Sequence, residues 1–276
     1  MPEGPEVQTV ISTLERQIKG ARIEDVEVRY EKCVEPNITD FKRVIGQSFL
    51  EFSRIGKYLI FTMEDFQMVV HLRMEGKFYI LDSRPEAKTW KHIHVIFRLE
   101  DGRYLCYHDT RKFGRLGLYD KMEDFSKLPP LVNVGYDVLD QRATGRYFYE
   151  QIHHSQRTLK AALLDQSILA GIGNIYANEI CFSAGLDPRS RCTRISKKDC
   201  EQIVFHAKRI LNGAIKAGGT TIRSYTSSLG VTGLFQLKLK VHAREGEPCL
   251  VCGTPIKKIV VNTRGTYLCQ QCQKRK

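Results

Sequence analysis

Apolar residues near the amino terminus recur with the spacing of one helical face. They follow one another mostly at intervals of three and four, with polar side chains between them: Val7, Val10, Ile11, Leu14 and Ile18. Residues spaced in this way share one side of an α-helix. Pro5 suits the first turn, where its missing N–H is not needed, and Gly20 suits the end. The pattern predicts an amphipathic helix at the start of the chain.

From about residue 21 to residue 119 this spacing gives way to short β-type runs. The runs alternate apolar with polar residues or are rich in β-branched and aromatic ones: IEDVEVRY, FLEFSRIGKYLIFT, FQMVVHLRM, GKFYIL, HIHVIFRL and RYLCYHD. Such runs are typical of strands. The LEDGR sequence indicates a hairpin, since Asp-Gly accepts the positive φ of a tight turn. We predict an antiparallel β-sandwich or barrel that carries the first helix on its flank.

The stretch KLPPLVNVGYDVLD, residues 127–140, separates the β-rich part from a helical part. Its paired prolines and weak periodicity are typical of a linker. At 276 residues the chain is long enough for two modest domains. We predict an α+β protein with a β-sandwich over 1–132, a helical domain over 133–236 and a metal-binding segment over 237–276.

Three helical signals follow the linker. A short apolar face in residues 159–163 is interrupted by AGIGN, and IYANEICFSAG then predicts a helix that ends before Gly185. Ser196 and Asp199 have the spacing of a capping box for a long helix that ends near residues 218–219. The polar stretch TTIRSYTSSLGVTG, which follows, predicts a loop.

Four of the nine cysteines form two C-x2-C pairs: Cys249, Cys252, Cys269 and Cys272. The spacing matches a four-thiolate zinc site, because each pair lets two sulfurs converge on one ion. The β-rich residues between the pairs suit a hairpin. Two disulfides are the alternative, but the other cysteines are scattered and odd in number, as in a reduced cytosolic protein. We predict one structural Zn²⁺ and no organic cofactor.

The charge balance indicates a polyanionic partner. The chain has 43 Lys and Arg against 31 Asp and Glu, and the segment from Lys238 to the carboxyl end holds nine basic and two acidic residues. Such a segment suits a polyanion, although a solvated basic face explains charge alone equally well. There is no apolar run of membrane-spanning length and no basic-then-apolar leader, so we expect a soluble cytoplasmic protein without a membrane partner.

Seven motifs in a fixed order give the chain a family resemblance. They cover essentially its whole length: MPEGPEV, RIGKY, HLRMEGKF, HDTRKFGRL, LLDQSILAGIGNIYANEI, GGTTIRSY and the four-cysteine finger with NTRGTYLC inside it. Together they resemble the formamidopyrimidine-DNA glycosylase and endonuclease VIII family of base-excision repair enzymes. HLRMEGKF, GNIYANE and the carboxyl-terminal half look like the formamidopyrimidine branch. The opening MPEG is more typical of the endonuclease VIII branch, and VGYDVL departs from the family's usual linker.

The resemblance implies a catalytic β-sandwich, a helix-two-turn-helix DNA-binding domain and a zinc-finger hairpin. It implies a monomeric DNA glycosylase and abasic-site lyase that acts on damaged double-stranded DNA in the bacterial cytosol, at the nucleoid. Oxidised purines, namely 8-oxoguanine and formamidopyrimidines, would be excised through an amino-terminal proline Schiff base and β,δ-elimination. An endonuclease VIII-type enzyme for oxidised pyrimidines and a non-catalytic zinc-ribbon DNA-binding protein are the alternatives.

By this resemblance Pro2 is the nucleophile. Removal of the initiator methionine would expose its secondary amine, which can attack C1′ of the damaged nucleoside and leave an iminium that acidifies the C2′ proton. Glu3 is expected to protonate the sugar ring oxygen. Lys57 is expected to grip phosphates, and Arg264 to clamp the phosphate of the flipped nucleotide. Stabilisation of the helix start is an alternative role for Glu3 and for Glu6.

A second group of residues is expected to bind DNA around a flipped base. Met74, Arg111 and Phe113 match the residues that fill the gap and pair with the orphaned base. Taken singly, they would be a core methionine, a surface arginine and a core phenylalanine. Asn174 is expected to hold a phosphate at a helix start, assisted by Lys160.

The remaining expectations concern histidines and base choice. His71, His92 and His94 either contact phosphate or complete strand packing; packing is favoured, and only His92 is counted among the DNA-binding residues. Base choice is assigned to the loop after the long helix and to one residue outside it. The residues expected to recognise the lesion are Glu75, Thr220, Thr221 and Arg223.

Overall fold

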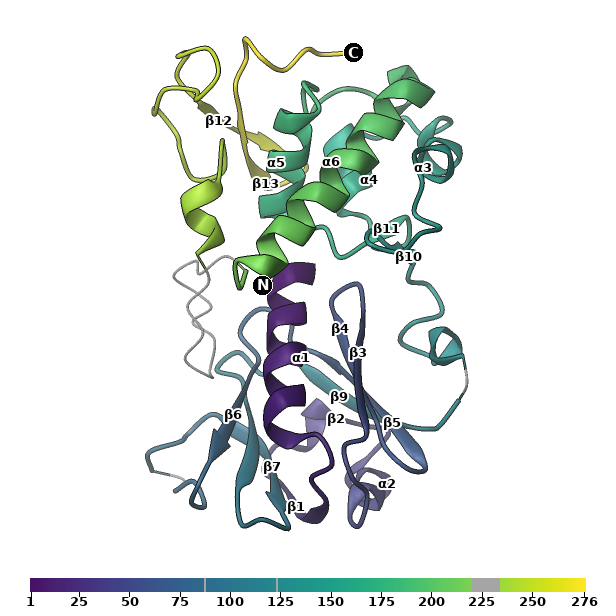
Figure 1. Cartoon of the computed structure of the whole chain (residues 1–276), viewed down its shortest axis with the longest axis vertical. Coiled ribbons are helices and arrows are strands. Elements are labelled where there is room, and N and C mark those ends of the chain that lie inside the picture. Colours follow the sequence, from purple (N-terminus) through teal and green to yellow (C-terminus); the bar gives the residue numbers. More distant parts are fainter. Residues whose placement is uncertain (87, 123, 220–233) are drawn as a thin grey trace. The chain divides into compact units, whose positions relative to one another are not determined.

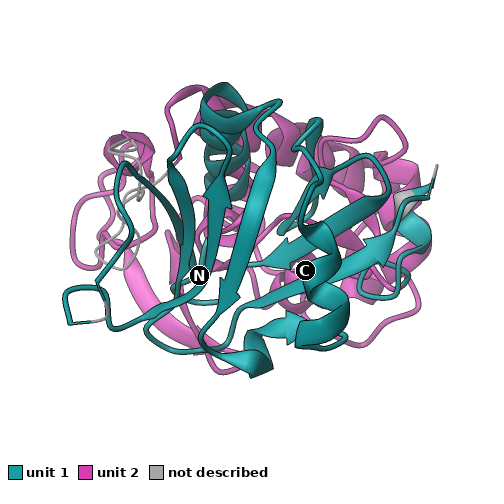
Figure 2. Cartoon of the chain, turned by 90° about the horizontal axis from the view of Figure 1, so that it is seen from below, with its two compact units in different colours: residues 1–2, 6–132, 220–233 teal, residues 3–5, 133–219, 234–276 magenta. Residues whose placement is uncertain are grey.

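The computed structural model describes the chain except residues 87, 123 and 220–233, and Figure 1 shows its elements. The described residues fall into two compact units, which Figure 2 distinguishes by colour. The first contains residues 1–2 and 6–132, and the second contains residues 3–5, 133–219 and 234–276. Within the described part of the chain, no helix is both long and apolar enough to cross a membrane.

The first unit is built on two sheets. One has the strand order β1-β7-β8-β6 and the other β2-β9-β5-β4-β3. The strands are β1 (Ile23–Val28), β2 (Val34–Glu35), β3 (Glu51–Ile55), β4 (Tyr58–Thr62), β5 (Phe66–His71), β6 (Lys77–Leu81), β7 (Ile93–Leu99), β8 (Tyr104–His108) and β9 (Arg115–Asp120). All the predicted β runs form strands, and Gly102 of LEDGR has the positive φ, 84°, that the hairpin between β7 and β8 requires.

One strand pair departs from the antiparallel prediction, because β2 runs parallel to β9. The strand before β2 belongs to the other sheet, so the chain reaches this edge by a crossover and not through a hairpin. Short helices that the sequence pattern did not predict lie around it: η1 (Glu31–Cys33), α2 (Ile38–Phe41) and η2 (Lys42–Val44).

Helix α1 (Gly4–Ile18) confirms the first prediction. Its five predicted apolar residues are at most 3% exposed and belong to the same hydrophobic cluster as the inner residues of both sheets. Full burial of one such side chain contributes about 1.5–3 kcal/mol, so the stripe holds α1 firmly to this core. Gly20, just beyond the helix, has a φ of 83°, as expected of a helix stop.

The second unit is mainly helical. Its elements are β10 (Tyr136–Asp137), α3 (Gly145–Ile152), α4 (Leu159–Leu164), β11 (Leu169–Ala170), α5 (Asn174–Ser183), η4 (Cys192–Arg194), α6 (Lys197–Lys216), η5 (Phe235–Lys238), β12 (Lys257–Val261) and β13 (Arg264–Leu268). The capping box of Ser196 and Asp199 is present, and Gly185 has a φ of 68° beyond α5. Helix α3 was not predicted, and it has only eight residues.

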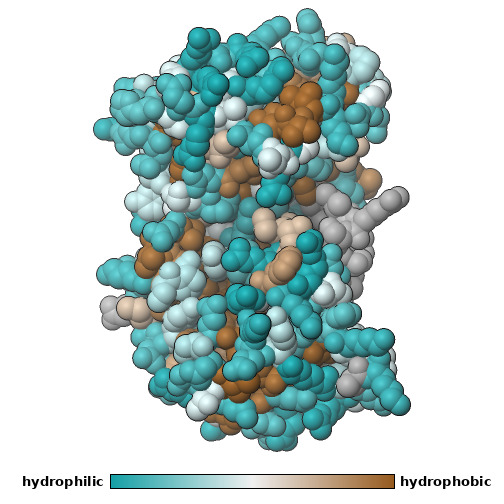
Figure 3. Space-filling view, turned by 180° about the vertical axis from the view of Figure 1, so that it is seen from behind, coloured by the Kyte–Doolittle hydropathy of each residue, from teal (hydrophilic) through white to brown (hydrophobic). Residues whose placement is uncertain are grey.

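The face drawn in Figure 3 is predominantly hydrophilic. On the face drawn in Figure 3, hydrophobic residues form separate patches among hydrophilic ones.

A short helix, η3 (Phe125–Lys127), lies shortly before the end of the first unit.

Candidate functional site

Glu3 is fixed at the amino end of α5. The side chain is 3% exposed, and its carboxylate accepts hydrogen bonds from the backbone N–H of Ile175 at 2.9 Å and of Tyr176 at 3.4 Å. Gly4 adds a bond from its own N–H to the carbonyl of Gly171, 2.9 Å long. The first amides of a helix lack partners within the helix, and its positive end favours an anion. Glu3 therefore takes the place of a capping side chain.

Gly173 makes this arrangement sterically feasible. It is the N-cap residue of α5 and offers no side chain to the helix. A Cβ atom at this position would lie 2.2 Å from Cδ of Glu3, which no real contact allows. The AGIGN interruption is thus the place where the carboxylate of Glu3 enters.

Pro2 precedes this anchored residue directly and is buried, while Met1 is 43% exposed. In the full chain the Pro2 nitrogen is an amide bonded to Met1, and an amide nitrogen is not a nucleophile. Only a chain that has lost Met1 offers the secondary amine that the predicted chemistry needs.

Arg264 lies at the tip of the zinc hairpin, where it is exposed as the first residue of β13. The two residues before it, Asn262 and Thr263, have φ values of 49° and 62°, which is the backbone of a tight two-residue hairpin turn. The hydroxyl of Thr158, the N-cap of α4, donates to Oδ1 of Asn262 at 2.7 Å. The tip is therefore held both by its own turn and by the start of α4.

Lys160 is a fully buried residue. It is 0% exposed, and its ammonium donates to three acceptors: Oδ1 of Asn178 at 3.0 Å, the carbonyl of Gly265 at 3.1 Å and Oγ1 of Thr266 at 2.6 Å. Burial, followed by the nearby charge of Arg264, lowers its pKa from 10.5 to about 8. All three donors are used inside the protein, so the predicted assistance to a phosphate stays a prediction and would act through the groups that Lys160 holds.

Asn174, the first residue of α5, also faces the hairpin. Its Nδ2 donates to the carbonyl of Gly265 at 3.1 Å, the same oxygen that Lys160 binds. Its Oδ1 is buried and has no hydrogen-bond partner among the described residues. Two backbone amides at this helix start, those of Ile175 and Tyr176, donate to Glu3.

The predicted gap-filling residues meet on two loops of the first unit. Met74 and Glu75 lie between β5 and β6, and Arg111 and Phe113 lie between β8 and β9, so both loops cross from one sheet to the other. Met74 is 36% and Phe113 50% exposed, and Cζ of Arg111 lies 5.0 Å from the centroid of the Phe113 ring. The hydroxyl of Thr110 donates to the Glu75 carboxylate at 2.5 Å. The loops are thus joined, with apolar side chains on the surface.

Lys57 lies in the turn between β3 and β4, inside the run FLEFSRIGKYLIFT, which was predicted as β structure throughout. It is 6% exposed. Its charge acts on His71, whose pKa falls from 6.5 to about 3, first through burial and then through Arg73 and Lys57. Nδ1 of His71 accepts from the N–H of Arg73 at 3.0 Å, so the ring is neutral and bonded inside the protein.

The other two predicted histidines differ in burial. His94 is buried, and its Nε2 lies 2.7 Å from the carbonyl of Asp109, as strand packing predicts. His92 is half-buried, with its ring 5.7 Å from that of His108. Three of the predicted lesion-recognition residues lie outside the described residues: Thr220, Thr221 and Arg223.

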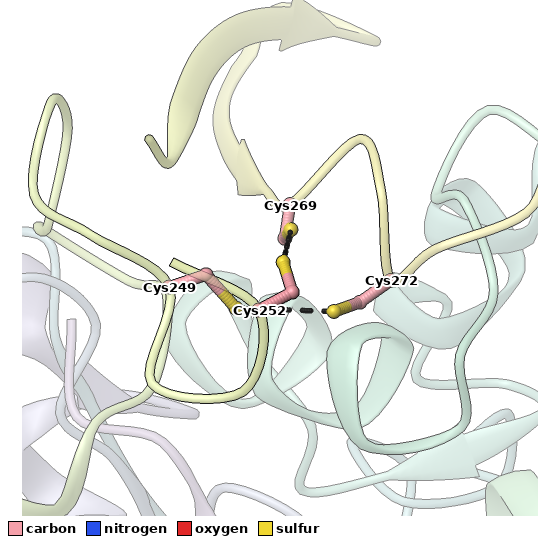
Figure 4. A group of neighbouring side chains, drawn as sticks. All are labelled: Cys249, Cys252, Cys269 and Cys272. Carbon is pink, nitrogen blue, oxygen red and sulfur yellow. Dashed lines mark hydrogen bonds between the residues drawn. The ribbon is translucent and has the colours of Figure 1, made fainter. Parts of the chain in front are cut away.

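The four paired cysteines converge as predicted (Figure 4). Their sulfurs all lie within 4.8 Å of one another, with Cys252 and Cys269 3.4 Å apart and Cys249 and Cys272 3.9 Å apart. Tetrahedral Zn–S bonds of about 2.3 Å place sulfurs about 3.8 Å apart, so the group fits one zinc ion. Four thiolates close the coordination sphere, which makes the zinc structural.

Three residues that shape these sites were not singled out from the sequence: Thr158, Gly173 and Asp109. Gly173 gave a signal, because a glycine directly before a helix indicates a close approach by another group. Thr158 could have been identified as a helix cap, but not as a partner of the hairpin. Asp109, inside HDTRKFG, looks like an ordinary turn residue until its contacts are seen.

Comparison with known proteins gives full-length matches. Residues 1–116 match the Formamidopyrimidine-DNA glycosylase N-terminal domain, residues 134–226 the Formamidopyrimidine-DNA glycosylase H2TH domain, and residues 246–275 the zinc finger found in FPG and IleRS. The formamidopyrimidine-DNA glycosylase of Bacillus licheniformis is 43% identical over 282 residues, and that of Bacillus subtilis 41% over 281, both with complete coverage of both chains.

Solved structures of Lactococcus lactis Fpg are similar over 99% of this chain and 100% of theirs. The complex with DNA containing an abasic site has a TM-score of 0.88 at 34% identity. A mutant complex with DNA containing Fapy-dG has a TM-score of 0.89 at 35% identity. A wild-type complex with DNA containing an oxidised pyrimidine has a TM-score of 0.87 at 34% identity.

Proposed function

The chain belongs to the formamidopyrimidine-DNA glycosylase family, and from this premise we propose that Pro2, once Met1 is removed, is the nucleophile of its reaction. The protein is a DNA glycosylase and abasic-site lyase of base-excision repair, with one structural zinc. Oxidised purines, 8-oxoguanine and formamidopyrimidines, are its proposed substrates. The names of the relatives and the Fapy-dG complex of the Lactococcus protein support this choice.

The proposed reaction begins when the lone pair of the Pro2 nitrogen forms a bond to C1′. The bond between C1′ and the base breaks, and the base leaves with the electron pair and takes up a proton from solvent. The proton released from the proline nitrogen passes to Glu3 and then to O4′ as the sugar ring opens. The resulting iminium is permanently cationic, so it acidifies the C2′ proton, and loss of that proton expels the 3′ phosphate. A second elimination expels the 5′ phosphate, and water releases the enzyme.

The observation that carries this proposal is the anchoring of Glu3. Two backbone amides of α5 fix its carboxylate, and it is the residue adjacent to Pro2. A carboxylate so fixed can accept and return a proton in one geometry, which is what general acid–base catalysis needs. If Glu3 served only to cap α5, it would not need to be the neighbour of Pro2, the proposed nucleophile.

The exposure of Arg264 supports its proposed contact with DNA. Arg264 presents a guanidinium at the hairpin tip, which suits two-point binding of a phosphate, and Lys57 and Asn174 are proposed to complete the phosphate contacts. Met74, Arg111 and Phe113 are proposed to fill the gap that the flipped base leaves. Glu75 and His92, with residues 220, 221 and 223, are proposed to contribute to lesion and strand recognition.

The remaining proposals concern assembly. The protein is proposed to act as a monomer on double-stranded damaged DNA in the bacterial cytosol, at the nucleoid. Its functional division is proposed as a catalytic β-sandwich over 1–132, a helix-two-turn-helix domain over 133–236 and a zinc finger over 237–276.

Borohydride trapping tests the nucleophile. A duplex with 8-oxoguanine opposite cytosine should give one covalent protein–DNA adduct, and peptide mapping should find it on Pro2 with Met1 absent. Pro2→Gln, which retains Met1, should bind the duplex normally and trap nothing. An adduct on another residue would overturn the proposal, and the absence of any adduct would favour a non-catalytic DNA-binding protein. Faster release of thymine glycol than of 8-oxoguanine would favour the pyrimidine-specific alternative.

Gly173→Ala tests the role of Glu3 without changing either reactive residue. The new Cβ must displace the Glu3 carboxylate, whereas a Cβ at Gly213 in α6 would find its nearest neighbour at 3.8 Å, so Gly213→Ala is the matched control. We expect about a 100-fold loss of single-turnover base release for Gly173→Ala, with unchanged DNA affinity. Equal rates in the two variants would contradict the proton-transfer role.

A further inference from the structure

The carboxylate of Asp109 organises the loop between β8 and β9. The residue is 0% exposed. Its Oδ1 accepts from the backbone N–H of Arg111 at 3.0 Å, and its Oδ2 accepts from those of Phe113 at 2.9 Å and Gly114 at 2.8 Å. Among the described residues, no ion pair joins this carboxylate to a cationic side chain. Its buried charge is therefore balanced mainly by amides of the loop itself.

The backbone of Asp109 is held as tightly as its side chain. Its N–H donates to the carbonyl of His92 at 2.9 Å, and its own carbonyl accepts from the N–H of Lys112 at 3.3 Å and lies 2.7 Å from Nε2 of His94. Lys112 has a φ of 60°, a conformation that a lysine adopts only when its surroundings impose it. The residue between Arg111 and Phe113 is thus forced into a turn, and the two flanking side chains are brought within 5.0 Å of each other.

The same group supports the neighbouring loop, through Tyr107. The Tyr107 hydroxyl lies 3.4 Å from Oδ2 of Asp109. A Cβ atom would lie 1.6 Å from this hydroxyl if placed on Gly114 and 2.6 Å if placed on Gly76, so the hydroxyl lies directly beneath both loops. Gly76 follows Met74 and Glu75. One buried hydroxyl and one buried carboxylate therefore lie against the two loops that carry the residues proposed to fill the DNA gap.

We propose that Asp109 is the positioning residue of this gap-filling element: it holds Arg111 and Phe113 in their working arrangement before DNA binds. The inference rests on the proposed function, because the gap exists only when a base is flipped out of a duplex. Preorganisation of this kind removes the cost of ordering the loop at the moment of binding. Asp109 touches no reacting atom and acts only through the residues that it holds.

Asp109→Asn tests the proposal, because one acceptor oxygen is replaced by a donor that faces backbone N–H groups. We expect about a 50-fold loss of single-turnover release of 8-oxoguanine from a duplex. Borohydride trapping on an abasic site in a single strand, which has no orphaned base and no stack to fill, should change by less than about threefold. A simple loss of folding would lower the release rate on the duplex and the trapping on the single strand to the same degree, and that outcome overturns the proposal. Asp109→Glu, which keeps the charge but displaces the oxygens, should repeat the selective loss.

Combination with the residues that Asp109 holds gives a second readout. In an Arg111→Ala, Phe113→Ala background, Asp109→Asn should cause no further loss on the duplex, since positioning has nothing left to act on. Asp187→Asn is the matched control: this carboxylate is 2% exposed, accepts from the N–H of Arg189 at 2.8 Å, and lies in the other unit. Asp187→Asn should leave release from the duplex and trapping on the single strand within about twofold of the unsubstituted protein.

The result that overturns the inference is an additive loss in the combined variant. Failure of the proposed function is a different result, because the unsubstituted protein would then trap neither substrate. Measurement of the unsubstituted protein in each assay therefore distinguishes failure of the inference from failure of the proposed function.

Discussion

Two loops, one in each unit, present an exposed arginine, and they are held by buried residues of opposite charge. Beneath Arg111 the carboxylate of Asp109 accepts three backbone N–H groups. Beside Arg264 the ammonium of Lys160 donates to the carbonyl of Gly265 and to Oγ1 of Thr266. In both cases the buried group binds backbone or neutral side chains and leaves the arginine free to meet a ligand.

The local backbone explains the choice of charge. The loop that begins at Asp109 turns tightly and leaves the N–H groups of Arg111, Phe113 and Gly114 without strand partners, so it needs an acceptor. The hairpin presents the Gly265 carbonyl to α4 and α5, so it needs donors, which Lys160 and Asn174 supply. A buried charge is stable in each place because the backbone provides the opposite dipoles.

The loops differ in what lies beneath them. The loop of Arg111 stands on the sandwich core, whereas the hairpin has a small cluster of its own: Phe182, Val241, Ile256 and two zinc-site cysteines, Cys249 and Cys269. A cluster of that size cannot fix a hairpin alone, so the metal must contribute most of its stability. The comparison predicts that loss of the zinc or of a buried supporting group affects the DNA contacts of Arg111 and of Arg264 differently.

Loss of the metal should have the largest effect. Cys269→Ser should disorder the hairpin, since structural zinc contributes about 10 kcal/mol to such a site. Affinity for a duplex with a non-cleavable abasic analogue should fall more than about 100-fold, and hydrogen exchange of β5 should not change. Cys200→Ala, at a buried thiol of α6 outside the zinc site, is the control and should bind DNA normally. Faster exchange in β5 would show that the first unit also depends on the metal.

Removal of the buried ammonium should rank second. Lys160→Met leaves the Gly265 carbonyl with one donor fewer and the Thr266 hydroxyl without its lysine partner, and an unmet buried group costs about 1–3 kcal/mol. Affinity for the same duplex should fall about 30-fold, which corresponds to about 2 kcal/mol.

A second lysine provides the control for this substitution. Lys208 also donates to a backbone carbonyl, that of Asp140 at 2.8 Å, but on α6. Lys208→Met should therefore destabilise the second unit without a comparable loss of affinity. If the two variants bound DNA equally weakly, loss of positive charge would explain the result and positioning would not.

A change of pH should affect the hairpin of Arg264 through Lys160, and its effect on DNA affinity should be smaller than that of the substitutions. The pKa of Lys160 is about 8 in the folded protein against an ordinary 10.5, so below pH 8 both folded and unfolded chains carry the proton. Between these values the unfolded chain binds more protons, and the stability of the second unit should rise with pH. The deprotonated amine has one donor fewer, so DNA affinity should fall about fivefold between about pH 7 and pH 9. Lys160→Met should abolish that fall, and an unchanged fall would exclude Lys160 as its source.

Much of the fold was predictable because its signals are local. The spacing of apolar residues in α1, the Asp-Gly turn before β8 and the capping box of α6 each involve neighbours in sequence. The parallel pairing of β2 with β9 was not predictable, because it depends on where a crossover ends. The zinc ligands were an exception among long-range features, since cysteine spacing itself encodes the geometry.

The residues that support the sites could not be predicted from local sequence signals. Lys160 was predicted to assist a phosphate contact, whereas its contacts in the structure are with residues as far as 105 and 106 positions away. Glu3 meets its amide partners 172 and 173 positions away. Sequence motifs predicted which groups react or bind, but the groups that hold them are defined by tertiary contacts.

The smallest effect should come from the one side chain that joins α4 to the hairpin tip. The Thr158 hydroxyl accepts from the N–H of Ala161 as a helix cap and donates to Oδ1 of Asn262 at 2.7 Å. Thr158→Ala should cost about 1 kcal/mol of stability through the cap and reduce DNA affinity about twofold through the tip. Thr158→Ser keeps the hydroxyl and should restore both.

Ser196→Ala supplies the comparison that isolates the tip. Ser196 caps α6 in the same way, accepting from the N–H of Asp199, but its cap hydroxyl has no role at the hairpin tip. The two alanine variants should therefore lose similar stability in thermal unfolding, while only Thr158→Ala weakens binding of the abasic-analogue duplex. Equal binding by both would mean that zinc, Lys160 and the turn already fix Arg264 completely, and that the hairpin, like the loop of Arg111, is positioned from beneath and not from its tip.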